Sequence, residues 1–148
     1  MHGIFQISEA FSLALHGMGL LAKRGRRTSV KEIARVMGVS EAHLAKVFQR
    51  LAKSGLVASM RGPKGGFVLA KPAEQITLYD IYKVVEGEPA QQYCLLTKDY
   101  CPFGECLLGG VVQTLTEEFS SYLRGKTLAE LTGRENDGQG QAEHHSHR

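Results

Sequence analysis

Three cysteines fall within thirteen positions of this chain and are the side chains best suited to metal or redox chemistry. Cys94, Cys101 and Cys106 are the only cysteines in the 148-residue sequence. Closely spaced thiolates are soft metal ligands, and they can also be oxidised reversibly. An odd count in a chain that we expect to be cytoplasmic disfavours a framework of structural disulfides. The group therefore predicts metal ligation or redox sensing.

A second set of side chains, on residues 40–54 (SEAHLAKVFQRLAKS), has the character needed to contact nucleic acid. Ser40 is typical of a helix N-cap. Apolar residues recur at helical spacing on one face, and these are Leu44, Val47, Phe48 and Leu51. The other face is polar and basic, with His43, Lys46, Gln49, Arg50 and Lys53. Such a helix fits the major groove of DNA, although an ordinary amphipathic helix has the same pattern.

The residues before this stretch predict the first helix of a helix-turn-helix. Ser29 and Glu32, three positions apart, match a capping box at the start of VKEIARVMG. Gly38-Val39-Ser40 then predicts a tight turn before the basic helix. A packed helical hairpin without special function would give the same pattern, but the short turn and the basic second helix favour DNA binding.

A β-hairpin is predicted directly after the basic helix. Residues 56–60 and 67–70 are typical of short strands, and residues 61–66 (RGPKGG) predict the turn between them. Arg61 and Lys64 lie on a glycine-rich backbone that can approach a phosphate or the minor groove closely. Together with the helix-turn-helix, this hairpin predicts a winged helix-turn-helix DNA-binding domain.

Further helices are predicted on either side of this unit. Residues 4–23 have a helical pattern with Ser8 as a plausible N-cap, and Thr77 begins a helix that ends near residue 86. Residues 107–124 are helical and more apolar than a lone surface helix should be. That helix must therefore pack on the winged helix or on a second copy of the chain. A short capped helix is expected at 127–131.

The predicted fold class is mainly α with a small β-wing, a winged helix-turn-helix domain followed by a long dimerisation helix. We divide the chain into a DNA-binding domain, a cysteine-rich loop, a dimerisation helix with a short terminal helix, and a disordered tail. Their bounds are 1–90, 91–106, 107–132 and 133–148.

The charge of the chain is unevenly distributed. Residues 1–72 hold 12 Lys+Arg and 3 Asp+Glu, a balance of +9, whereas residues 73–148 hold 6 and 12, a balance of −6. This asymmetry indicates a nucleic-acid-facing front, with a chance division of surface charge as the alternative. We expect a cytoplasmic protein, because there is neither a signal-peptide pattern nor an apolar run of the ~18 residues that a membrane span needs.

At this level of detail the sequence resembles the bacterial redox- and iron-sulfur-responsive transcription regulators typified by IscR, NsrR and CymR. The resemblance covers about residues 7–132, and its marks are VKEIARVMGVS, GLVASMRGPKGGFVLAKP, ITLYDIYKVVEG, the three cysteines and TLAEL. The HLAKV segment is nearer the NsrR branch. The resemblance implies a homodimer whose long helices cross, with two recognition helices in successive major grooves of a palindromic operator.

The resemblance also implies that Cys94, Cys101 and Cys106 hold an iron-sulfur cluster, of the 2Fe-2S or 4Fe-4S kind. The spacing C-x6-C-x4-C differs from the nearly equal gaps of about five expected for the family. The IscR branch takes a His three residues after the last cysteine as fourth ligand, and this chain has Gly109 there. The NsrR branch takes an Asp of the partner's first helix, which aligns with Ser12. Glu9 and His16, one helical turn to either side, are further candidates, as are water and a thiol.

We expect a DNA-binding transcription regulator, acting as a repressor, that senses redox state, nitric oxide or iron-sulfur status through its cysteines. The alternative is a cluster-free regulator that senses by thiol oxidation. An enzyme is disfavoured, because neither a nucleophile–base pair nor a phosphate-binding loop is recognisable. The predicted DNA contacts are Thr28, Ser29, Ser40, His43, Lys46, Gln49, Arg50, Arg61 and Lys64.

Overall fold

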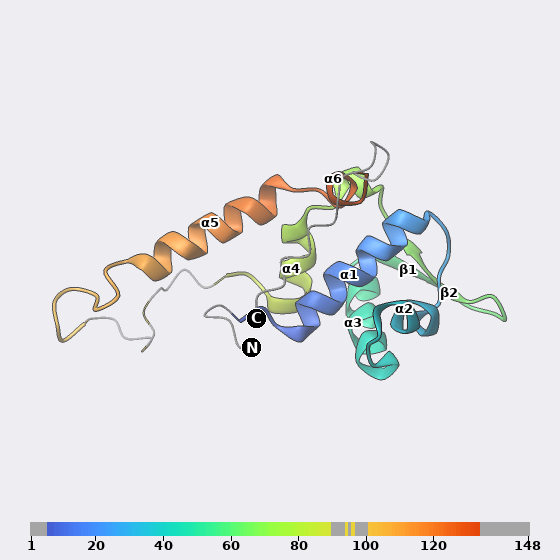
Figure 1. Ribbon diagram of the computed structural model, residues 1–148, viewed down its shortest axis with the longest axis horizontal. Helices are drawn as coiled ribbons and strands as arrows, with labels where there is room; N and C mark the ends of the chain where they lie inside the picture. The colour runs from blue at the N-terminus through green and yellow to red at the C-terminus, as the bar shows by residue number, and fades with distance from the viewer. Residues whose placement is uncertain (1–5, 90–93, 95, 97–100, 134–148) are drawn as a thin grey trace, which may run out of the picture.

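The computed structural model describes residues 6–89, 94, 96 and 101–133, and these are mainly helical with one small sheet (Figure 1). The elements in chain order are α1 (Glu9–Arg24), α2 (Val30–Met37), α3 (Glu41–Lys53), β1 (Val57–Met60), β2 (Gly66–Leu69), a 3-10 turn η1 (Ala73–Gln75), α4 (Leu78–Glu86), α5 (Val111–Gly125) and α6 (Leu128–Thr132). The predicted fold class is confirmed. The tail predicted to be disordered, and part of the cysteine loop, lie outside the described residues.

Hydroxyl side chains determine where five of the helices begin. At each N-cap the side-chain oxygen accepts a hydrogen bond from the backbone N–H three residues later, and the caps are Ser8, Ser29, Ser40, Thr77 and Thr127. Each such cap contributes roughly 1 kcal/mol to the stability of its helix. All five caps were recognisable in the sequence, because Ser and Thr satisfy otherwise unpaired N–H groups at helix starts.

Two helix starts and one cap differ from the sequence prediction. Helix α1 begins at Glu9 and not at residue 4, since residues 6–8 are not helical. Helix α5 begins at Val111 and not at residue 107, because Gly109 and Gly110 have φ of 58° and 79° and form a turn. Ser29 caps α2 as expected, but the Glu32 carboxylate pairs with arginines and does not complete a capping box.

The core lies between α1, α3 and α4, and packing in this core fixes the orientation of α3. Phe48, Leu44 and Leu51 of α3 are fully buried, together with Met18 of α1 and Ile81 of α4. Helices α1 and α3 approach so closely at Gly17 that an added Cβ would lie 2.6 Å from the Phe48 ring. The apolar face predicted for α3 therefore points into the core, and its polar face is left outward.

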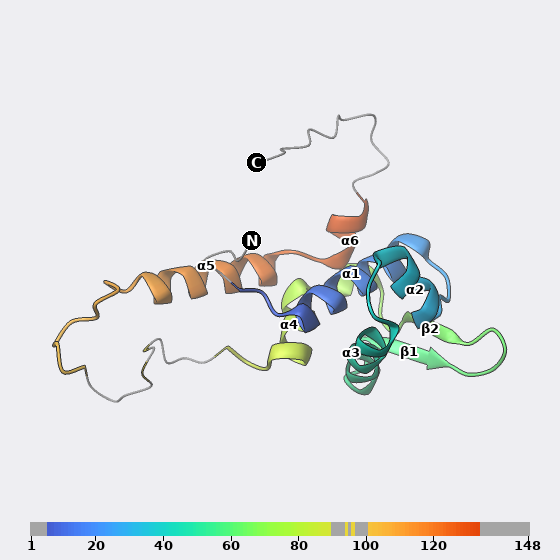
Figure 2. The same ribbon diagram turned by 60° about the horizontal axis from the view of Figure 1, so that its bottom comes forward.

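The wing, residues 57–69, is attached to the helix-turn-helix along two lines. Its strands are antiparallel, with Val57 opposite Leu69 and Met60 opposite Gly66. Phe67 packs edge-on against Phe48, with ring centroids 5.1 Å apart. The backbone of Thr28 also exchanges two hydrogen bonds with Phe67, of 3.0 and 2.9 Å, so that the α1–α2 connection extends the sheet. Figure 2 shows the hairpin projecting beyond α2 and α3.

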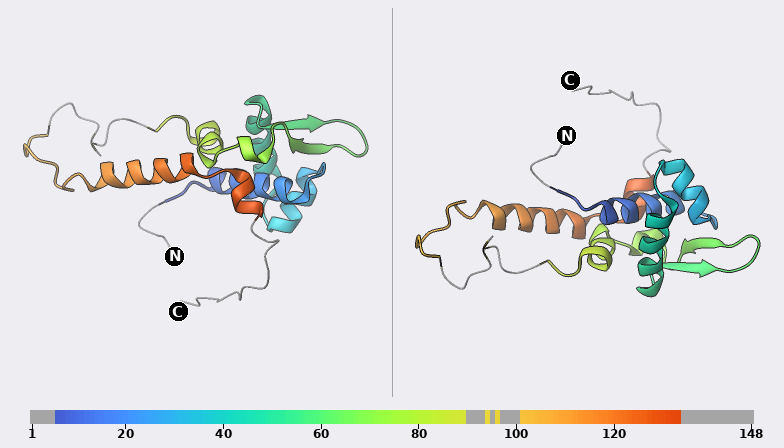
Figure 3. Two further views of the ribbon diagram at one scale, coloured as in Figure 1. Left: turned by 90° about the horizontal axis from the view of Figure 1, so that it is seen from above. Right: turned by 90° about the horizontal axis from the view of Figure 1, so that it is seen from below.

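Helix α5 projects from the opposite end of the molecule to the wing (Figures 1 and 3). It contacts α4, and Leu123 is its one buried side chain. The chain then returns to the body, where Leu78 and Leu128 donate backbone hydrogen bonds to Lys126 and Ile76, of 3.0 and 2.8 Å. Among the described helices, none is both long and apolar enough to cross a membrane.

Candidate nucleic-acid interface and cysteine segment

The outward face of α3 carries the predicted base-reading side chains. Lys46 and Gln49 are exposed, and the His43 side chain is 61% exposed. Ser40 begins the helix by accepting a hydrogen bond of 3.3 Å from the His43 backbone. His43 Nδ1 lies 3.9 Å from Glu9 Oε1, which brings the first turns of α1 and α3 together. The face is open and hydrogen-bonding, as a helix that enters the major groove requires.

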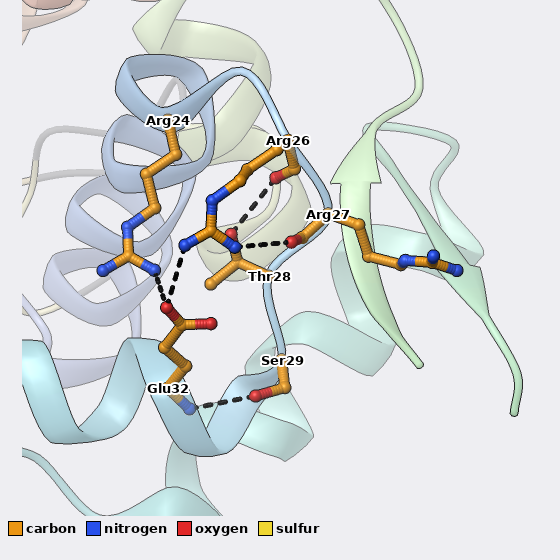
Figure 4. A network of polar contacts seen from close by, with 6 residues as sticks. All are labelled: Arg24, Arg26, Arg27, Thr28, Ser29 and Glu32. Atoms are coloured by element: carbon orange, nitrogen blue, oxygen red, sulfur yellow. Dashed lines mark hydrogen bonds and ion pairs between the residues drawn. The ribbon is translucent and has the colours of Figure 1, made fainter. Parts of the chain in front are cut away.

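An ion-pair network joins the end of α1 and the α1–α2 loop to α2 (Figure 4). Arg24 and Arg26 both contact Glu32 Oε1, with Arg26 Nη2 at 3.1 Å. The pKa of the Glu32 carboxyl is lowered, first of all by the hydrogen bond from Arg24. Burial is next in size and opposes this shift, and the hydrogen bond from Arg26 and the charges of both arginines add to the lowering. Arg27 extends the other way, and its Nη1 lies 4.0 Å from Met60 Sδ on the wing.

Thr28 and Ser29 lie in the same loop but differ in access. Ser29 is half-buried and its hydroxyl caps α2. Thr28 is 1% exposed, and its hydroxyl donates a hydrogen bond of 3.1 Å to the Arg26 carbonyl. This burial leaves the Thr28 side chain little surface for the expected phosphate contact, and the Thr28 backbone holds the loop against β2. Sequence reasoning missed this role, since a pairing between residues 28 and 67 has no local pattern.

The wing tip presents the two expected cations. Arg61 and Lys64 are exposed in the turn between β1 and β2. The turn closes through a 2.8 Å hydrogen bond from the Gly65 N–H to the Gly62 carbonyl, and Gly62 has φ of 109°. Only glycine adopts such a conformation without strain, so the turn carries its two cations on a backbone without bulky neighbours.

Arg50 is held differently from the other polar residues of α3. Its Nη2 donates hydrogen bonds to the carbonyl oxygens of Val84 and Val85, at 3.0 and 2.8 Å. Both carbonyls belong to the last turn of α4, where helical partners are lacking and a cation is favoured. The structure thus directs toward α4 a guanidinium that the sequence assigned to the DNA groove.

The three cysteines are reduced thiols that differ in exposure. Cys94 and Cys101 are half-buried, Cys106 is exposed, and none of the three forms a disulfide. Cys101 Sγ lies 3.5 Å from the Glu105 carbonyl oxygen. Within the part of the chain that the structure describes, no three His, Cys, Asp or Glu side chains are arranged to hold a metal ion. The donor chemistry of three thiols therefore fits a soft metal centre, whereas their positions within one chain do not assemble it.

The three candidates for a fourth ligand share one side of α1. His16 Nδ1 lies 2.7 Å from the Ser12 carbonyl oxygen and 3.4 Å from its hydroxyl. The Glu9 side chain is 75% exposed. None of them joins the cysteines in a ligand group within the described residues. Their assignment stays a prediction.

Apolar side chains remain exposed along residues 107–122, which lead into and form α5. They are Leu107, Leu108, Val111, Phe119 and Tyr122, with exposed fractions from 37% to 77%. A groove of about 710 Å³ runs between the start of α1, α4 and α5, lined by Phe11, Tyr82 and Leu115 among others. Burial, and then the nearby Glu86 charge, raise the pKa of the Tyr82 phenol there. Exposed apolar surface of this kind is typical of an interaction site.

A helix-turn-helix with a hairpin fixed to its second helix and an exposed polar recognition face defines a winged-helix DNA-binding protein. The chain belongs to the Rrf2 family, whose model is described as an iron-dependent transcriptional regulator and matches residues 7–134. It is therefore a transcription regulator and not an enzyme.

Named relatives agree with this assignment. The chain is 33% identical to the HTH-type transcriptional regulator IscR of Yersinia enterocolitica, over 87% of this chain and 75% of that protein. Among solved structures, CymR, the global cysteine regulator of B. subtilis, is 31% identical with a TM-score of 0.69, covering 90% of this chain and 100% of CymR. IscR of T. potens is 27% identical with a TM-score of 0.72, covering 93% and 95%.

Proposed function

We propose that this regulator is a homodimeric repressor that binds a palindromic DNA operator with an affinity set by the state of Cys94, Cys101 and Cys106. The observation that carries the proposal is the placement of α3. Its apolar face is locked in the core and against Phe67 of the wing, so that its polar face and the wing present as one unit. Rigid elements of this kind hold base-contacting side chains in a defined geometry.

The contacts with DNA divide by chemistry. His43, Lys46 and Gln49 supply hydrogen bonds to base edges in the major groove, because they stand on the exposed face of α3. Ser29 and Ser40 lie at the starts of α2 and α3, where N–H groups favour phosphate. Arg61 and Lys64 at the wing tip reach phosphate or the minor groove.

A second copy of the chain is proposed as the partner of α5. Val111, Phe119 and Tyr122 are 45%, 37% and 52% exposed on this helix. Crossing of two such helices would bury these side chains and fix the separation of two recognition helices. Two-fold symmetry of the protein then matches two half-sites one helical turn of DNA apart.

Cys94, Cys101 and Cys106 would hold an iron-sulfur cluster, which when bound supplies iron–thiolate links among them and a centre that reacts with oxygen or nitric oxide. Glu9, Ser12 or His16 of the partner subunit's first helix is the proposed source of a fourth ligand. The chain's own contribution is positional, because a cross-linked loop between α4 and α5 restrains both helices. A change that releases the loop alters the pose of the recognition helices and hence the operator affinity.

A second form of the proposal keeps the regulator but assigns sensing to the thiols themselves. It is supported by the exposure of Cys106 and by the absence of a disulfide at any of the three cysteines. Oxidation or mixed-disulfide formation would then change the loop without metal. Anaerobic purification with iron and sulfide analysis distinguishes the two forms: a coloured, iron-containing protein supports the cluster, and a colourless protein free of iron supports the thiols.

Substitution on α3 tests the DNA assignment itself. We expect Lys46→Ala and Gln49→Ala each to weaken binding to a duplex selected by the wild-type protein about ten-fold or more. Lys126→Ala is the control for Lys46→Ala, because it removes the same positive charge at the α5–α6 junction. It should leave DNA binding unchanged. Wild-type affinity in both α3 variants would refute the proposed reading face.

A further inference from the structure

The last turn of α4 and the two residues after it, residues 84–88, are contacted by side chains of two other elements and by Tyr79 from the first turn of α4 itself. The Ser8 hydroxyl, at the start of α1, donates a hydrogen bond to the Glu86 carboxylate. Arg50 of α3 donates to two carbonyls of the same turn. The Tyr79 hydroxyl donates to Glu88 Oε2 at 2.8 Å. We call residues 84–88 the α4 end.

The contact from α3 is the one that reaches backbone carbonyls of the α4 end. A guanidinium that donates to two helix-terminal carbonyls makes charge-assisted hydrogen bonds, which are stronger than neutral ones. The carbonyls have no helical partner of their own, so the loss of Arg50 leaves them to solvent. Arg50 lies between the buried Leu51 and the exposed Gln49, and its contact thus joins the recognition face to α4.

The α4 end directly precedes the part of the chain that contains the cysteines. Gly87 closes the helix with φ of 80° and donates a hydrogen bond of 3.0 Å to the Lys83 carbonyl. Cys94 follows seven positions after Gly87. Arg124, at the end of α5, donates a hydrogen bond of 3.0 Å to the Tyr79 hydroxyl and lies 4.3 Å from its ring centroid. Glu88 of the α4 end and Arg124 at the end of α5 therefore meet at Tyr79.

We propose that Arg50 is a positioning residue that transmits the state of the three cysteines to the recognition helix α3, and that it is not a DNA contact. Movement of the α4 end shifts two carbonyls that Arg50 holds, and α3 turns with them. The inference rests on the proposed function, because it takes DNA binding and cysteine sensing as given. It adds a physical connection between them, because Arg50 of α3 donates hydrogen bonds to two carbonyls of the α4 end, nine and ten positions before Cys94.

The test is a double-mutant cycle on the full chain. Operator affinity is measured for the protein with its cysteines and for Cys94→Ser/Cys101→Ser/Cys106→Ser, each with Arg50 and with Arg50→Ala, on a duplex selected by the wild-type protein. Coupling between two sites typically changes affinity 5- to 150-fold. The quantity compared is the ratio of operator affinities with and without the three cysteines. We expect this cysteine ratio to lie in that range with Arg50, near one with Arg50→Ala, and between the two with Arg50→Lys.

The salt dependence separates a positioning role from a phosphate contact. Loss of one phosphate contact lowers the slope of log affinity against log salt by about 0.9. Arg50→Ala should keep the wild-type salt slope but bring the cysteine ratio close to one. Arg61→Ala on the wing should lower the salt slope and leave the cysteine ratio unchanged. A lowered slope with an unchanged ratio in Arg50→Ala would overturn the inference.

Hydrogen exchange without DNA keeps the test independent of the proposed function. Arg50→Ala should speed amide exchange in residues 84–88 several-fold, whereas the exposed neighbour Lys53→Ala should leave it unchanged. Unaltered exchange in Arg50→Ala would overturn the inference even if the protein binds DNA. If the wild-type affinity does not depend on the cysteines while Arg50→Ala speeds this exchange, the sensing proposal fails and the contact of Arg50 with α4 stands.

Discussion

The winged-helix body and the α5 arm differ in how far they bury their apolar side chains. In the body, formed by α1–α4, the wing and α6, residues such as Phe48, Ile33 and Ile81 have no exposed surface. Along the arm, residues 107–125, Leu123 is the one buried side chain, and Leu107 is 77% exposed. The body therefore completes its core within a single chain, and the arm does not. This difference agrees with the proposal that the body carries stability and DNA contact and that the arm packs on a second copy of the chain.

The largest expected difference between the two regions comes from truncating the same residue type in each. Phe48→Ala empties a fully buried site that contacts α1 and the wing, and it should cost about 3–5 kcal/mol of unfolding free energy. Phe119→Ala removes a ring that is 37% exposed and packs edge-on against Tyr82 alone of the described rings, so it should cost far less. Urea denaturation measures both. Equal losses would mean that the arm has a core of its own.

A pair of glycine substitutions gives the next largest contrast. An Ala Cβ at position 17 would lie 2.6 Å from the Phe48 ring, so Gly17→Ala should force α1 and α3 apart and cost roughly 1–3 kcal/mol. At Gly125, the last residue of α5, an added Cβ meets nothing within 4 Å. Gly125→Ala is therefore the matched control. Thermal denaturation should lower the Tm of the first variant only.

Polar substitution of the arm tests its role in assembly. Val111→Ser with Tyr122→Ser should leave monomer unfolding nearly unchanged, because both side chains are about half exposed. The dissociation constant of the dimer should rise about ten-fold or more, since roughly 25 cal/mol is lost per Å² of apolar surface no longer buried. Analytical ultracentrifugation over a concentration series measures this. A dimer as stable as the wild type would place the interface elsewhere.

The smallest expected effect concerns Glu32, whose carboxylate shields two arginines of the body. Glu32→Gln frees Arg24 and Arg26, so non-specific DNA affinity should rise a few-fold and the salt dependence should steepen. Lys31→Gln, one position earlier and exposed, changes charge in the opposite sense and should weaken binding. Fluorescence anisotropy on a random duplex follows both. An affinity of Glu32→Gln at or below that of the wild type would contradict the shielding.

The pH dependence of that ion pair has a defined sign. The folded-state pKa of Glu32 lies below its usual value of 4.5, because Arg24 and then Arg26 stabilise the carboxylate. The stabilisation is therefore present above the unfolded-state pKa and is lost as the pH falls through the folded-state pKa. In Arg24→Gln, NMR titration should find the Glu32 pKa closer to 4.5.

Local patterns in the sequence were sufficient for the elements and for the open face of α3. Ser40, Thr77 and Thr127 begin helices where their side chains predicted, because capping acts over three residues. The hairpin at 57–69 followed from two apolar runs and a glycine-rich turn. The start of α5 was predicted four residues too early, because the apolar periodicity begins before Gly109 and Gly110. Both glycines have a left-handed backbone, so the helix begins only after them.

Partners far apart in the sequence were decided by the tertiary structure alone. Thr28 is buried against β2, and Arg50, predicted as a DNA contact on the polar face of α3, donates to carbonyls 34 and 35 positions away. Capping, alternation and helical spacing are short-range effects that a sequence displays directly. The partner of a long cationic side chain depends on which helix end the core brings within its reach, and that follows only from the packing of α3 on α4.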